Sequence, residues 1–177
     1  NAKGFLDAVF RLLASEDDSL KPEIIRTLEA GTELFRARGA ENYKKAKEIS
    51  EDPASQLGPT PKDRASSQRM TPTGISALYC ALERETCLSE IRSITGDDVV
   101  SVALTPTSTL RVLDLTKLEL VEPPQLTLLD IGYLDAQHLK TFINSLVKKM
   151  SKPKRRNDDL SYLSTQVVFE YLRLRFG

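Results

Sequence analysis

An arginine and a tyrosine occupy positions where their side chains could bind a ligand. Arg36 lies between Phe35 and Ala37 in a predicted strand, so it either points to solvent from a half-exposed sheet or reaches a buried anion. Tyr79 stands among small residues on one face of another predicted strand, where its ring could line a pocket as a stacking platform. Taken singly, core packing or surface charge explains each side chain at least as well.

A glutamate is the third candidate, because its helical position places it beside the predicted core. At ~100° per residue Glu90 projects about 60° from Cys87, at the margin of the stripe that Cys87, Ile91 and Ile94 would bury. A carboxylate half inserted there must be paired or placed at a cleft, since an unpaired buried charge is costly. A salt bridge to a local arginine, Arg84 or Arg92, explains the position equally well.

The elements that would carry these residues follow from apolar spacing and from breaker residues. We predict helices at residues 5–13, 22–28, 87–93, 136–150 and 160–174, and strands at residues 33–38, 76–82, 98–104 and 109–115. Between Gly39 and Gly74 the apolar content falls and four prolines interrupt regular structure, so residues 40–56 are predicted to be a floppy insertion. From Gly58 onward, the prolines would restrict the backbone around Arg69.

The composition is typical of one soluble domain without overall charge. The 177 residues include 25 Lys+Arg and 25 Asp+Glu, and 40% are hydrophobic. Zero net charge argues against a protein whose main task is to grip phosphate backbones, because such proteins carry surplus cations. No run approaches the ~20 apolar residues that cross a bilayer, and no secretory signal is visible. We therefore expect a cytoplasmic protein with no membrane contact and no direct nucleic-acid partner.

The histidine and cysteine content argues against a metal site. Cys80 and Cys87 show neither a disulfide framework nor the spacing of metal ligands. His138 is the single histidine of the chain, and we expect it on the surface of a helix. A catalytic triad built on His138 would lack the Gly-x-Ser-x-Gly elbow that usually accompanies one. The basic run at residues 152–156 is expected to be a solvated loop instead of a nucleic-acid-binding arm.

Several separated blocks, in consistent order, resemble the RES-domain family, which is named for an arginine, a glutamate and a serine. The blocks are residues 34–38 (LFRAR), 68–75 (QRMTPTGI), 77–81 (ALYCA), 86–92 (TCLSEIR) and 162–166 (YLSTQ), with Glu170. We therefore predict an accessory helical segment at residues 1–31 and a RES-like catalytic domain at residues 32–177. Because the family's signature serine follows the last helix, we expect a truncated C-terminal end, and a first residue other than Met suggests trimming there too.

The resemblance implies an α+β fold similar to that of ADP-ribosyltransferases, with a mixed β-sheet core and flanking helices. It implies a toxin that cleaves the nicotinamide–ribose bond of NAD+ and transfers ADP-ribose to water or phosphate. NAD+ is then the substrate, and no bound cofactor is expected. The expected partners are a helix-turn-helix antitoxin protein that blocks the active site and further copies of the chain in a homo-oligomer. A protein ADP-ribosyltransferase and a catalytically silent binding module are the alternatives.

By position, the resemblance makes Arg36 the signature arginine, Tyr79 the pocket tyrosine and Glu90 the signature glutamate. Arg69 falls in a Gly-Arg-Met-type block, in which Gln68 replaces the glycine.

These residue types fit the implied chemistry. Bond cleavage develops an oxocarbenium ion, which a carboxylate such as Glu90 can stabilise while it holds a ribose hydroxyl. Arg36 and Arg69 suit a pyrophosphate, because forked, charge-assisted hydrogen bonds match its oxygens better than a lysine does. Tyr79 can stack on nicotinamide. Nicotinamide departs as a neutral amine, so no strong general acid is needed. No Gly-x-Gly-x-x-Gly fingerprint is present, as expected where NAD+ is consumed as a substrate.

Overall fold

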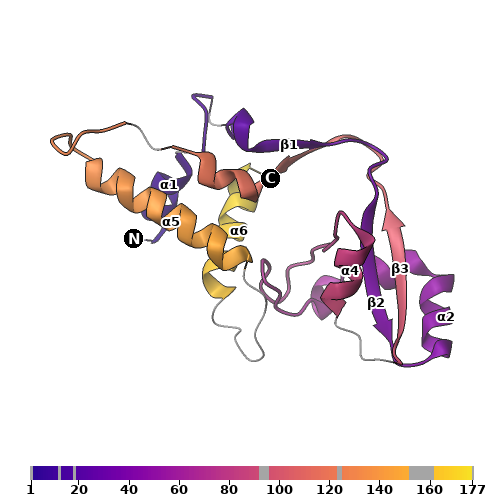
Figure 1. Ribbon diagram of the computed structural model, residues 1–177. Helices are drawn as coiled ribbons and strands as arrows, with labels where there is room; N and C mark the ends of the chain where they lie inside the picture. Colours follow the sequence, from indigo (N-terminus) through magenta and orange to yellow (C-terminus); the bar gives the residue numbers. More distant parts are fainter. Residues whose placement is uncertain are drawn as a thin grey trace. The chain divides into compact units, whose positions relative to one another are not determined.

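The chain forms two compact units in the computed structural model. Residues 2–11, 13–17, 19–91, 96–122, 125–151 and 162–176 are described. Unit 1 draws on residues 1–27, 67–72 and 111–177, and unit 2 on residues 28–66 and 73–110. The helices and strands of the two units are labelled in Figure 1.

Unit 1 is a helical unit whose core joins the two ends of the sequence. Its helices are α1 (Ala2–Arg11), η1 (Pro22–Ile24), η3 (Leu115–Leu120), α5 (Tyr133–Ser151) and α6 (Leu163–Phe176). Val9 of α1, Ile143 of α5 and Val168 of α6 belong to one cluster of buried side chains. Phe10 stacks on Tyr171 of α6 with ring centroids 4.9 Å apart. Burial of apolar area is the main force that holds these helices together.

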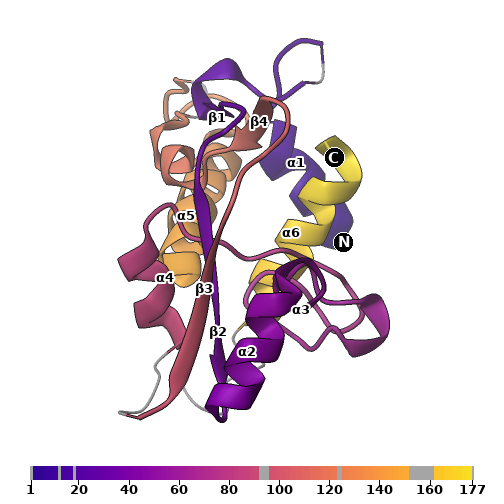
Figure 2. The same ribbon diagram turned by 90° about the vertical axis from the view of Figure 1, so that its right-hand side faces the viewer.

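Unit 2 is built on an antiparallel ribbon of two strands, β2 (Leu34–Ala40) and β3 (Asp98–Leu104). Its helices are α2 (Tyr43–Glu51), α3 (Pro53–Leu57), η2 (Lys62–Arg64) and α4 (Arg84–Ile91). The helices α4 and α2 lie on opposite sides of the ribbon (Figures 1 and 2). A second pair of strands, β1 (Ile25–Leu28) and β4 (Leu110–Leu113), forms a separate two-stranded sheet, most of whose residues belong to unit 1.

Strand alternation explains which side chains meet which helix. Successive residues of a strand point to opposite faces. Phe35 faces α4, because the Arg84 guanidinium lies 4.7 Å from its ring centroid. Gly39 faces the same helix, since a Cβ there would lie 3.8 Å from Ile91. On the other face, Val100 and Val102 pack against a small core of Ala40, Ile49 and Leu57.

The mixture of helices and small sheets confirms the predicted α+β class, whereas the likeness to ADP-ribosyltransferases stays a prediction. The first helix, the strands at β2, β3 and β4, and the helices at α4, α5 and α6 all appear close to their predicted positions. Among the described helices, none is long and apolar enough to cross a membrane. The predicted basic loop at residues 152–156 lies outside the described residues.

The predicted floppy insertion at residues 40–56 is wrong, because this segment contains α2 and α3. Asn42 caps α2 by accepting a hydrogen bond from the Lys45 amide at 2.9 Å. Asp52 caps α3 by accepting one from the Ser55 amide at 3.3 Å, directly before a proline at the first helical position. Such caps supply partners for amides that the helix itself cannot pair. Local capping therefore outweighed the low apolar content.

The predicted strand at residues 76–82 is also wrong. One residue pair joins it to the ribbon: the amides and carbonyls of Phe35 and Ala81 exchange two hydrogen bonds of 2.8 Å. Earlier in the segment, the Ser76 hydroxyl donates to the carbonyl of Thr60 at 2.7 Å, which ties the chain to a loop instead of to β2. Leu78, Tyr79 and Leu82 are exposed as a result. A short apolar run forms a strand only where a partner strand is free along its length.

The predicted helix at residues 22–28 is wrong for its second half. Pro22 does open a short 3-10 helix, with proline at the position that needs no amide donor. The chain then becomes extended in β1, at Ile25, because this segment pairs with β4. Tertiary pairing here overrides a weak helical pattern.

Candidate functional site

Arg36 is the third residue of β2, directly opposite Val102 of β3. On the other edge of β2, Phe35 forms an antiparallel bridge with Ala81. In antiparallel pairing, the residue after Phe35 lies opposite the residue before Ala81, so Arg36 lies opposite Cys80. Residues opposite one another share a face of the sheet. Arg36, Cys80 and Val102 therefore share the face turned away from the helix that Phe35 contacts.

The Arg36 guanidinium holds an unpaired donor away from water. Its Nη1 atom is buried and has no hydrogen-bond partner in the described part of the chain. Buried polar atoms almost always have partners, and each exception requires an explanation. A guanidinium also keeps its positive charge at physiological pH. An anion supplied from outside the chain would satisfy both the donor and the charge.

The thiols near Arg36 do not neutralise it. Burial raises the pKa of Cys80 above its usual value, although the positive charge of Arg36 opposes this shift. Burial likewise raises the pKa of Cys87, against the opposing charges of Arg84 and Arg36. Both thiols are therefore protonated and uncharged near neutral pH. The positive charge at Arg36 is left without a thiolate counterion.

Glu90 is exposed on α4, so the expectation that it is half inserted into the core is wrong. Cys87 is the buried residue of this helix, and Ile91 is half-buried beside the strand. The expected salt bridge to Arg84 does not form. Instead, Arg84 covers the Phe35 ring and donates from Nη1 to the Ser101 hydroxyl at 3.0 Å. The other expected partner, Arg92, lies outside the described residues.

The side chain of Glu90 lies outside the core because α4 buries only a narrow stripe of its surface. The helix has eight residues, and it meets the ribbon through Arg84, Cys87 and Ile91, which lie three or four positions apart. Glu90 carries no hydrogen bond or ion pair to Arg36 within the described residues. Its carboxylate is thus accessible to a ligand that approaches unit 2 from solvent.

Tyr79 is 41% exposed and lies two residues before the bridge at Ala81. Its segment, Arg36 and the helix that carries Glu90 all belong to unit 2. Three of the four predicted site residues thus belong to unit 2, but Arg36 lies on the face of the ribbon turned away from α4, the helix that carries Glu90.

Arg69 belongs to unit 1, where its side chain is half-buried. Its Nη1 donates to the carbonyl of Met150 at 3.2 Å, next to the last residue of α5. Basic side chains commonly satisfy carbonyls that a helix end leaves unpaired. The hydroxyl of Thr165 donates to the Arg69 carbonyl at 2.8 Å. Both the side chain and the backbone carbonyl of Arg69 are thus held by hydrogen bonds within unit 1.

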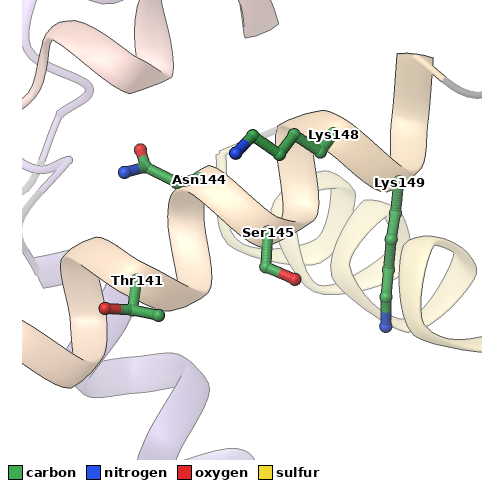
Figure 3. A pocket seen from close by; sticks show the side chains of 5 residues that line it. All are labelled: Thr141, Asn144, Ser145, Lys148 and Lys149. Carbon is green, nitrogen blue, oxygen red and sulfur yellow. The ribbon is translucent and has the colours of Figure 1, made fainter.

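Two surface hollows of the described residues lack the predicted site residues among those that line them. One, of about 460 Å³, lies along α5 and is lined by Thr141, Asn144, Ser145, Lys148 and Lys149 (Figure 3). Another, of about 650 Å³, is lined by residues of α1 and α6 and by Ala14. No group of three potential metal ligands occurs in the described ranges. His138 is exposed on α5, as expected.

Two features of these units do not follow from the sequence patterns. The sequence assigns Cys80 no role beside Arg36, whereas the bridge next to Cys80 places it opposite Arg36. Gln166 is buried in α6 and donates to the segment that carries Arg69. The available signal was its place four positions after the apolar ring of Tyr162, which puts both side chains on one face of the predicted helix.

Comparison with known proteins identified one family. The model of the RES domain matches residues 33–175. No curated protein and no solved structure matches the chain.

Proposed function

The chain belongs to the RES-domain family, and from this premise we propose that it is a toxin that cleaves the nicotinamide–ribose bond of NAD+. Membership of the family indicates an NAD-related function associated with toxin–antitoxin systems. The specific reaction, the acceptor and the residues below are our proposal. A helix-turn-helix antitoxin is the partner that this proposal includes.

The proposed reaction moves one electron pair and one group. The bond between ribose C1′ and the nicotinamide nitrogen breaks, and its electron pair neutralises the pyridinium. An oxygen of water or phosphate bonds to C1′, and water loses its proton to solvent. The transition state carries positive charge on the ribose, so an enzyme gains most from a carboxylate placed beside that ring. Glu90, exposed on α4, is our candidate for this role.

The observation that supports the proposal most directly is the buried, unpartnered Nη1 of Arg36. NAD+ offers a pyrophosphate whose oxygens accept forked hydrogen bonds from a guanidinium. Binding would give the buried donor its missing acceptor and would neutralise a charge that the nearby thiols leave uncompensated. Leaving such a donor unsatisfied costs about 1–3 kcal/mol or more, which favours a bound anion.

The remaining roles are assigned by family position. Tyr79 is proposed to stack on nicotinamide, and its side chain is 41% exposed. Arg69, in unit 1, takes a pyrophosphate-binding role in this proposal by its family position alone, and its Nη1 also donates to Met150. The other guanidinium nitrogens of an arginine leave further donors for a ligand.

The test measures release of free nicotinamide from NAD+ by chromatography, with and without phosphate. We expect Arg36→Ala to lower kcat/KM by about a hundredfold or more, because loss of one preorganised charge-assisted contact commonly has that effect. Arg36→Lys should restore little, since an ammonium lacks the fork. Glu90→Gln should lower kcat more than it raises KM, because its charge acts on the transition state.

Arg38→Ala is the matched control. Arg38 lies two residues farther along β2, and its Nη1 already donates to the Gln56 carbonyl and side chain, both at 3.1 Å. We expect kcat/KM of this variant to stay within about threefold of the parent, because its guanidinium is already partnered. Equal losses in Arg36→Ala and Arg38→Ala, or no nicotinamide from the parent protein, would contradict the proposal. The phosphate arm shows by mass whether ADP-ribose or its phosphorylated form accumulates.

A further inference from the structure

The buried polar side chains of the described residues lie where the first turn of α6 contacts residues 67–72 of unit 1. They are Thr71, Thr165 and Gln166, with exposures of 1%, 0% and 7%. Thr165 and Gln166 lie in the first turn of α6, and Thr71 belongs to the segment 67–72, which also carries Arg69. A buried polar group is retained at low cost only when its hydrogen bonds are satisfied. The contacts between α6 and residues 67–72 meet that condition.

Gln166 holds the segment along its length. Its Nε2 donates to the Ser67 hydroxyl at 2.8 Å and to the Gln68 carbonyl at 2.7 Å, and it reaches the Thr71 carbonyl at 3.4 Å. The Gln68 amide in turn donates to that same Thr71 carbonyl at 2.8 Å. One side chain therefore contacts both ends of the turn that contains Arg69.

Thr165 holds the middle of the same turn. Its hydroxyl oxygen lies 2.8 Å from the Arg69 carbonyl and 2.8 Å from the Tyr162 carbonyl of the preceding helical turn. Met70 packs against the apolar core of unit 1. The backbone of Arg69 is thus fixed on both sides in sequence and directly at its own carbonyl.

We propose that Gln166 and Thr165 are positioning residues, which fix the backbone of residues 67–72 and thereby the direction of the Arg69 guanidinium. An arginine has a long, flexible stem, so the direction of its head depends on a fixed Cα position and on a fixed anchor. A shift of about 1 Å in a binding group is enough to lower catalysis strongly. The effect on substrate rests on the function proposed above; the effect on the segment does not.

The experiment compares Gln166→Met, which keeps the length of the side chain but removes its donors, with Gln137→Met as the control. Gln137 is exposed on α5, so the same substitution there should leave kinetics and folding unchanged. We expect Gln166→Met to raise KM for NAD+ by roughly tenfold with a smaller change in kcat, because the lost contact acts on binding through Arg69.

A double-mutant cycle separates positioning from a general loss of structure. If Gln166 acts through Arg69, adding Gln166→Met to Arg69→Ala produces no further rise in KM, because the group being positioned is already gone. A further rise of the same size as in the parent background would overturn the proposal. Circular dichroism and thermal unfolding of each variant confirm that folded proteins are being compared.

Hydrogen exchange provides a readout that does not need NAD+. In Gln166→Met, the amides of residues 67–71 should exchange at least about tenfold faster than in the parent, while those of β2 and β3 stay unchanged. Unchanged exchange in the segment would overturn the proposal whether or not NAD+ is the substrate. Faster exchange in Gln166→Met, together with a parent protein that releases no nicotinamide, would support the positioning role of Gln166 and contradict the proposed reaction.

Discussion

The arginines of unit 2 differ in what surrounds their head groups, and this difference singles out one of them. Arg38 donates to Gln56, and Arg84 covers an aromatic ring and donates to a serine hydroxyl. Arg36 has a buried Nη1 for which no partner occurs among the described residues. A buried cation without a partner destabilises the folded protein, and a bound anionic ligand removes this cost by supplying the counterion. Residue type alone does not distinguish these three side chains.

The thiol of Cys80 provides a probe of the charge on Arg36. Its pKa lies above the usual value, chiefly because of burial, so its thiolate fraction and its alkylation rate are low at pH 7.5 and increase as the pH approaches the pKa. The positive charge of Arg36 lowers this pKa. Arg36→Met should therefore raise it further and slow the alkylation of Cys80 at a given pH. Peptide mass spectrometry after iodoacetamide treatment distinguishes Cys80 from Cys87.

Arg38→Met is the control for this reaction, because Arg38 is not among the causes of the shift at Cys80. It should leave the alkylation rate within about twofold of the parent. Faster alkylation in Arg36→Met than in the parent would mean that Arg36 shields the thiol sterically, and would contradict the electrostatic reading.

At the scale of elements, short helices with good caps define the face of the ribbon opposite α4. Both α2 and α3 begin at a side chain that accepts a backbone amide, and each buries one large apolar residue, Ile49 and Leu57. Isolated helices of this length are marginal, so caps and tertiary burial are both needed. Together with Val100 and Val102, they form the small core beneath the ribbon.

Removal of the α2 cap should weaken this face. We expect Asn42→Ala to lower the free energy of unfolding by about 1 kcal/mol, since the Lys45 amide loses its acceptor. Asn42→Asp should retain the cap and most of the stability. Glu41→Ala, at the exposed neighbour, is the control and should change stability by less than about 0.5 kcal/mol. Urea unfolding followed by circular dichroism measures all three; equal stability of Asn42→Ala and Glu41→Ala would contradict the cap's role.

At the scale of the whole molecule, α1 belongs to the core of unit 1. Val9, Phe10 and Leu13 are buried in the cluster that also contains residues of α5 and α6. Contacts between the two ends of a sequence are entropically costly to form, so they persist only where the buried apolar area is large. The boundary at residues 31 and 32 stays a prediction, but the first helix contributes directly to packing.

Truncation of a single core ring tests this contribution. Phe10 is 2% exposed and stacks on Tyr171 at 4.9 Å. We expect Phe10→Ala to destabilise unit 1 by about 3–5 kcal/mol through lost transfer energy and the cavity left behind. Tyr43→Ala removes a ring that is 77% exposed and should cost less than about 0.5 kcal/mol. A similar midpoint of denaturation for both variants would show that α1 does not contribute to the core.

Several elements could be predicted because their signals are local. The helix at α1 follows from apolar residues three and four positions apart, and the strands β3 and β4 follow from runs rich in valine and leucine between turn residues. The five separated blocks, among them those around Arg36 and Glu90, also predicted the family that the comparison confirmed. Their residue types restrict the chemistry, because only certain side chains bind phosphate or stabilise a cation.

Tertiary structure decided which segments pair and which side chains are buried, because local sequence patterns do not contain this information. Residues 76–82 read as a strand but meet β2 at one bridge, and residues 40–56 read as a loop but are capped and buried as helices. The exposure of Glu90 and the burial of the Arg36 Nη1 depend on what α4 and the bridged segment cover. The sequence by itself thus determined residue chemistry, family and the strongly periodic elements. Burial and pairing were decided by residues distant in sequence, because solvent exclusion depends on which segments pack together.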